Sequence, residues 1–261
     1  MKKQWAVLLL ALSLTACAGC GATGASSAAS GSAVSSSGAA SSGAVSSGAA
    51  SSGAAASSAA SDSFAADCAV GDSYTLDRSV TVSGGKALTL RLHGTRLNDS
   101  EYGISTVDVL DGDKVIQTVS VKDGIDDQWG GSSDAGTTTE SFSPDGDLTT
   151  ADMNFDGAGD IGLTAWTTPG ANIPAYYWLW DSDKQQFLYA FCLCNAKVDT
   201  TNQQIVCETR DGAAEHDTDY YTYDDSGKLQ NVERVVETVD ESGKTVTKTY
   251  VLDGGKLQEV K

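Results

Sequence analysis

Apolar and polar residues alternate along most of the chain beyond residue 73. Val107 and Val109 flank Asp108, and the segment 245–252 alternates in the same way. A period of two, with many Val, Thr and Tyr residues, is typical of half-buried β-strands. The apolar spacing within 229–239 would also suit a helix, but its many β-branched residues favour a strand.

Six short segments between these alternating stretches share one form. Each begins with Asp, Glu or Ser and ends with a Lys that enters the next apolar alternation, and five of the six contain Gly. Gly and Asp tolerate the positive φ angles of tight hairpin turns. The segments are 83–86, 111–114, 181–184, 225–228, 241–244 and 253–256. The pattern predicts an all-β antiparallel meander of about ten or more strands, arranged either as a two-sheet sandwich or in a propeller-like way.

The N-terminus has the features of an export signal. Lys2 and Lys3 precede a short apolar stretch, 5–14, which is too short to span a bilayer as a helix. The sequence Leu-Thr-Ala-Cys at 14–17 resembles a bacterial lipobox, which implies that residues 1–16 are removed and that Cys17 is lipidated. We therefore expect an extracytoplasmic protein that Cys17 tethers to a bacterial membrane. Ordinary signal cleavage after Ala18 is the alternative.

Low-complexity sequence follows the signal. Residues 21–61 contain only Gly, Ala, Ser and Val, apart from Thr23. Such a stretch has no large apolar side chain to bury, so it cannot compensate the entropy lost on ordering. We predict that residues 17–63 form a disordered linker after the lipidated cysteine. Residues 64–261 then form one domain, which is long enough to bury a sizeable core.

The chain is strongly acidic, with a formal net charge of -18. A field of that sign repels phosphate backbones, so nucleic acid is excluded as a partner. Cations and basic protein surfaces are favoured instead.

One acidic segment, 152–161, has the spacing of a calcium loop. Oxygen-bearing side chains fall at loop positions 1, 3, 5 and 9, and Gly157 stands at position 6, where such loops turn sharply. Hard oxygen donors without His or Cys indicate Ca²⁺. The predicted ligands are the side chains of Asp152, Asn154, Asp156 and Asp160 and the backbone carbonyl of Ala158.

The loop also departs from a helix–loop–helix calcium sensor. Position 12 is Leu163 instead of the usual Glu, and the flanking residues have strand patterns. The loop resembles the calcium loops between strands of FG-GAP and similar β-propeller repeats, with an expected dissociation constant of about 10⁻⁴–10⁻³ M. Asp145 and Asp147, just upstream, are candidates to complete the ligand shell. An acidic turn without a metal is the alternative.

Aromatic strands and turns follow the loop, at 176–181, Phe187, 220–223 and 227–229. This order is similar to a family of secreted bacterial lipoproteins that carry one calcium loop in a propeller-like β domain. The family includes an immunity protein that inhibits a lysozyme-like peptidoglycan hydrolase delivered by a type IV secretion system. The resemblance covers residues 145–235 and implies a protein-binding role, with a basic wall hydrolase as partner.

Two aromatic rows allow a second hypothesis. Tyr176, Trp178 and Trp180 share one face of a predicted strand, and Phe187, Tyr189 and Phe191 repeat the row across the next turn. Such a row is either buried in a core, which we favour because both faces of the strand are apolar, or a platform for stacking sugars. The second reading predicts a module that binds cell-wall glycan.

The remaining chemistry is sparse. The predicted domain has four cysteines. In one hypothesis Cys207 forms a disulfide with Cys192 or Cys194, and Cys68 forms a disulfide with the remaining one of these two. In the alternative all four remain thiols. No nucleophile-elbow, zinc-protease or P-loop motif is present, so we expect a binding protein and not an enzyme. A hydrolase that uses an unrecognised carboxylate pair is the remaining hypothesis.

Overall fold

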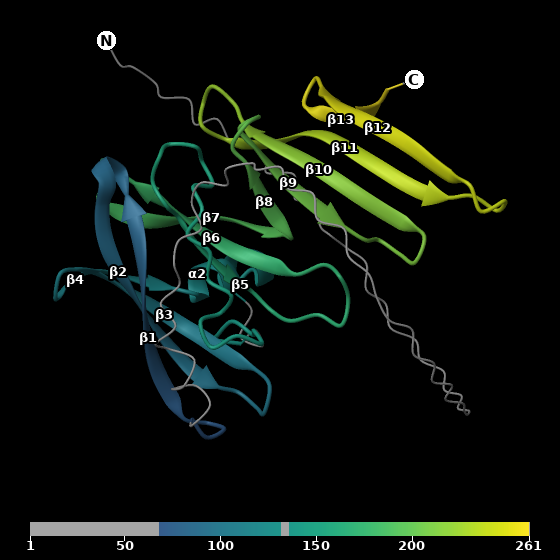
Figure 1. Ribbon diagram of the computed structural model, residues 1–261. Coiled ribbons are helices and arrows are strands. Elements are labelled where there is room, and N and C mark those ends of the chain that lie inside the picture. The colour runs from purple at the N-terminus through teal and green to yellow at the C-terminus, as the bar shows by residue number, and fades with distance from the viewer. Residues whose placement is uncertain (1–67, 132–135, 261) are drawn as a thin grey trace, which may run out of the picture. The chain divides into compact units, whose positions relative to one another are not determined.

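The computed structural model describes residues 68–131 and 136–260. The predicted signal peptide, the lipidation site Cys17 and the linker 17–63 lie outside the described residues. Within the described ranges, no helix has the length and apolar character needed to cross a membrane. The expected fold class is confirmed, because almost all regular structure is antiparallel β-sheet, arranged in three sheets (Figure 1).

The first sheet is a four-stranded meander in which each strand pairs with the next along the chain. The predicted alternation is present in its second strand, where Leu88, Leu90 and Leu92 are buried and the residues between them are half-buried. A short 3-10 turn, Ser83–Gly85, joins the first two strands. The strands are β1 (Ser73–Val82), β2 (Lys86–Arg96), β3 (Tyr102–Asp111) and β4 (Lys114–Ser120).

A short helix, α2 (Lys122–Trp129), follows the first sheet. Val121 stands at its N-terminal boundary, so this residue caps a helix and does not extend β4. Gly130 ends the helix with a left-handed φ of 63°. The second sheet consists of β5 (Ile161–Thr164), β6 (Pro174–Asp181) and β7 (Gln186–Cys194), again in chain order.

The third sheet has six strands, also in chain order. The segment 229–239 is one of its strands, as its β-branched content predicts. The described residues thus form three successive meander sheets and not the two sheets of a sandwich. In each sheet the strands pair in chain order, as they do in the blades of a propeller. The strands are β8 (Ala196–Asp199), β9 (Gln204–Thr209), β10 (Glu215–Tyr223), β11 (Leu229–Val239), β12 (Thr245–Asp253) and β13 (Lys256–Glu259).

All six predicted turn segments connect neighbouring antiparallel strands. Gly227 and Gly243 have φ angles of 78° and 80°, a left-handed conformation that favours glycine. The repeated turn pattern therefore reflects the backbone geometry that short hairpins require.

Two hydrophobic clusters hold the sheets together, and β6 contributes to both. Tyr176, Trp178 and Trp180 are buried in the first cluster, among apolar residues of the first sheet. Tyr177 points to the opposite side and belongs to the second cluster, with Ile205 of the third sheet. Both faces of β6 are thus covered, which confirms the core interpretation of this aromatic row.

The second aromatic row does not stay on one face. Tyr177 pairs with Phe191, but Trp178 pairs with Tyr189, so β7 has one extra residue, Ala190, at this point. This bulge reverses the alternation, because one inserted residue moves every later side chain to the other face. Phe187 and Tyr189 therefore pack in or against the first cluster, whereas Phe191 packs against the second.

Two of the cysteines are buried, one in each hydrophobic cluster. Cys68 belongs to the first cluster and Cys207 to the second, and both are thiols in the structure. Neither of the two predicted disulfide pairings is therefore present. Burial, with Asp219 and Cys194 nearby, raises the pKa of the Cys207 thiol to about 12, so this thiol is protonated at neutral pH.

Candidate functional site

The predicted calcium loop lies where the two hydrophobic clusters meet. Met153 is buried in the second cluster and Phe155 packs against it, whereas Ala158 belongs to the first. The polar residues that alternate with them, Asp152 and Asn154, remain partly accessible. The apolar positions of the loop thus fix it to the core and leave the side chains of Asp152, Asn154 and Asp156 accessible to solvent.

Backbone N–H groups of the loop orient its carboxylates. The Asp156 and Gly157 N–H groups donate to the Asp152 carboxylate, at 3.1 and 2.8 Å. The Ala158 N–H donates to Asp156 Oδ1 at 2.8 Å. Phe155 and Gly157 adopt positive φ angles of 63° and 86°, which fold the chain back on itself. Backbone N–H groups of the loop therefore hold the carboxylates of Asp152 and Asp156 in place.

Asp160 is the fully buried acid of the loop, with 0% of its surface exposed. Its carboxylate accepts hydrogen bonds from Met153 N–H at 2.7 Å and Trp180 N–H at 2.8 Å, so it ties the loop to β6. Burial raises the pKa of Asp160 to about 7, although these two hydrogen bonds oppose that shift. Each carboxylate oxygen has a second lone pair, which leaves Asp160 able to bind a cation as well.

Close backbone contacts hold the loop against β1. The Gly159 N–H donates to the Thr81 carbonyl at 2.7 Å. A Cβ at position 159 would lie 2.8 Å from the Thr150 carbonyl oxygen and 2.9 Å from Val80 Cγ2, so only glycine fits there. Strand β5 begins directly after Asp160, which confirms the predicted strand flank on this side of the loop.

Tyr223, at the end of β10, is a neighbour of the loop that sequence reasoning missed. Its hydroxyl is buried without a hydrogen-bond partner among the described residues. Burial raises the pKa of Tyr223, and the charges of Asp160, Asp152 and Asp156 raise it further. A buried oxygen without a partner beside these carboxylates fits a site that a cation or its bound water would complete.

Asp145 and Asp147, the two upstream candidates, have other partners. Arg78 donates to Asp145 Oδ2 at 2.8 Å, and the Ser141 hydroxyl donates to Asp147 Oδ2 at 2.6 Å. Both acids therefore have side-chain partners outside the loop, and their place in the ligand shell stays a prediction.

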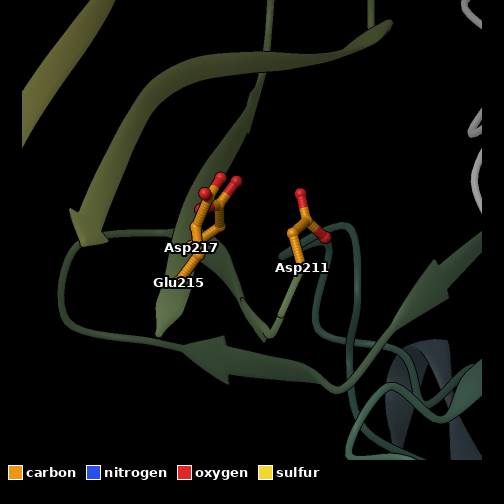
Figure 2. A group of neighbouring side chains, drawn as sticks. All are labelled: Asp211, Glu215 and Asp217. Carbon is orange, nitrogen blue, oxygen red and sulfur yellow. The ribbon is translucent and has the colours of Figure 1, made fainter. Parts of the chain in front are cut away.

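The structure brings a different set of acidic side chains closest together. Carboxylate oxygens of Asp211, Glu215 and Asp217 all lie within 4.8 Å of one another (Figure 2). Among the described residues this is the one such group of three, and the loop acids do not form another. No motif in the sequence indicates this group, because its members come from a connection and from alternate positions of a strand.

Comparison with known proteins finds solved structures of low sequence identity. No protein-family model matches the chain, and no curated protein matches it. A solved structure described as that of a Xanthomonas type IV secretion system related protein is 15% identical over 71% of this chain and 93% of its own, with a TM-score of 0.48. A protein of unknown function from Bacteroides fragilis is 8% identical over 73% of this chain and 90% of its own, with a TM-score of 0.23.

Proposed function

We propose that the chain is a membrane-anchored extracytoplasmic lipoprotein whose β domain is stabilised by Ca²⁺ and acts as a protein-binding inhibitor of a basic peptidoglycan hydrolase. In this proposal the domain is a binding protein and not an enzyme. Cys17, outside the described residues, would carry the lipid, and the linker that follows would let the domain reach the cell wall.

The observation that carries the calcium part is the buried Tyr223 hydroxyl, which lies beside the loop acids and has no hydrogen-bond partner among the described residues. Side-chain oxygens of Asp152, Asn154 and Asp156, the Ala158 carbonyl and Asp160 would hold the ion. These are hard donors, as Ca²⁺ prefers. The same loop contacts β1 through Gly159 and β6 through Asp160, so the ion would strengthen the junction between the first two sheets.

The outer strands of the third sheet supply the best candidate surface for a partner. Among the described residues, no side chain of β12 or β13 belongs to either hydrophobic cluster. Val239, Val251 and Val260 are exposed, and the register places them on one face of the sheet. Glu233 lies opposite Val251 on this face. Exposed apolar side chains next to acids suit a basic protein partner.

The alternative of a glycan-binding module loses its main support in the structure. Its stacking platform would need accessible aromatic rings, but Tyr176, Trp178 and Trp180 are all buried. Their rings pack edge to face against neighbouring aromatic residues, as in a protein core.

An inhibition assay tests the partner part of the proposal. A basic lysozyme digests purified peptidoglycan in the presence of the full-length protein, and the loss of turbidity reports activity. We expect inhibition at micromolar protein that weakens as salt rises, because exposed charges are screened. Val251→Asp should weaken inhibition, because it places a charge in the proposed contact.

A matched control separates this contact from a general effect of charge. Val115 in β4 is 47% exposed, close to the 41% of Val251, but lies in the first sheet. Val115→Asp should leave inhibition unchanged. Undiminished hydrolase activity at micromolar protein would show that the proposed inhibitor role is wrong.

A further inference from the structure

A second acidic site lies in the third sheet, apart from the 152–160 loop. Asp211 belongs to the connection between β9 and β10, and β10 contributes Glu215 and Asp217. Glu215 and Asp217 are two residues apart on a strand, so both side chains lie on the same face. Figure 2 shows these two carboxylates together, with Asp211 facing them. We call Asp211, Glu215 and Asp217 the β10 carboxylate group.

Asp217 is the member of this group that points to a ligand. It is only 5% exposed, and its Oδ1 is buried without a hydrogen-bond partner among the described residues. A buried carboxylate oxygen without a partner is costly, because it has lost water and gained nothing in exchange. Two further carboxylates within 4.8 Å add repulsion to this cost.

The guanidinium of Arg234 offsets only part of that cost. Arg234 Nη1 lies 4.0 Å from Asp217 Oδ2, beyond hydrogen-bond distance. The same guanidinium donates to both oxygens of Asp219, at 2.6 and 2.8 Å. Arg234 is therefore committed to Asp219, and Asp217 faces Asp211 and Glu215 with an incomplete set of partners. Burial and the charge of Asp211 raise the pKa of Asp217, whereas Arg234 lowers it.

We propose that the β10 carboxylate group binds a divalent cation, Ca²⁺, as a second metal site distinct from the 152–160 loop. Three carboxylates provide hard oxygen ligands without nitrogen or sulfur, which favours Ca²⁺ over transition metals. Water fills the rest of its coordination shell, because Asp211 is exposed. A cation here supplies the partner that Asp217 Oδ1 lacks and fixes the β9–β10 connection to the strand.

The test is a calcium titration by calorimetry on the full-length protein, with Ca²⁺ alone as the probe. The Asp156→Ala variant removes the loop site, so the Ca²⁺ that it still binds reports on the β10 carboxylate group. Adding Asp211→Asn, at an exposed position in a connection, should weaken this binding at least about tenfold, because affinity follows the charge of the ligands. Asp225→Asn, which neutralises an exposed acid in the next hairpin, is the matched control and should change nothing.

Asp217→Asn is a second test variant, and it keeps the shape of the side chain while removing its charge. It should also remove the binding that Asp156→Ala retains. If the unmutated protein binds Ca²⁺ and Asp156→Ala binds none, the β10 site is wrong and the loop site stands. If Asp156→Ala binds as much Ca²⁺ as the unmutated protein and Asp211→Asn abolishes all of it, the β10 site stands and the loop proposal fails.

Discussion

The 152–160 loop and the β10 carboxylate group collect acidic side chains in opposite ways. In the loop, backbone N–H groups two to five residues away donate to Asp152 and Asp156. In the β10 carboxylate group, Asp217 has a buried oxygen without any such donor in the described part of the chain. A loop that satisfies its own carboxylates can fold before a cation binds, whereas in our proposal a cation would offset the buried charge of the second group.

The largest expected effect is at the buried acid of the loop. Asp160→Ala leaves two buried N–H groups, of Met153 and Trp180, without acceptors. Each such group costs about 1–3 kcal/mol, so the free energy of unfolding in chelator should fall by roughly 2–6 kcal/mol. Urea denaturation measures this free energy of unfolding. Asp152→Ala is the control, because water can reach the N–H groups that donate to Asp152. A loss of similar size in this variant would contradict the special role of the buried acid.

The second prediction concerns how closely the loop is packed. Gly159→Ala places a methyl group against the Thr150 carbonyl and Val80, which should cost about 1–3 kcal/mol in the same urea experiment. At Gly212, in the β9–β10 connection, an added Cβ would meet no atom within 4 Å, so Gly212→Ala should stay within about 0.5 kcal/mol. Equal effects at the two glycines would remove the contrast between a tightly anchored loop and an open connection.

A smaller effect of opposite sign is expected at the β10 carboxylate group. In chelator, Asp217→Asn removes a buried charge whose Oδ1 has no hydrogen-bond partner among the described residues, so it should stabilise the domain by about 1 kcal/mol. In millimolar Ca²⁺ this advantage should disappear, because the unmutated site then binds its ion. Destabilisation of more than about 1 kcal/mol in chelator would instead show that the 4.0 Å contact with Arg234 is essential.

Much of the fold was predictable because its signals are local. Alternation specifies a strand, and six turn segments specify hairpins, so neither depends on distant residues. Helix α2 was missed because it has only eight residues and contains Gly124, which weakens any helical pattern. The face of Phe191 was misassigned because the bulge at Ala190 arises from pairing with β6.

The candidate sites show the same limit. The loop acids follow a spacing that the sequence displays, so Asp152, Asn154, Asp156 and Asp160 could be selected in advance. Tyr223 and the β10 carboxylate group could not, because sheet pairing and the packing of the third sheet bring them into place. Tyr223 and Asp217 stand out because each has a buried oxygen without a hydrogen-bond partner among the described residues. Residue spacing shows neither burial nor hydrogen bonding.

The most direct test of the account is the thermal melting of the full-length protein in millimolar Ca²⁺ and in chelator. Ca²⁺ at two to ten times its dissociation constant should add about 0.6–1.4 kcal/mol for each site, which raises the melting temperature by a few degrees. Asp156→Ala and Asp211→Asn should each remove part of this increase, and the double variant should remove all of it. Identical melting temperatures of the unmutated protein in Ca²⁺ and in chelator would contradict the account.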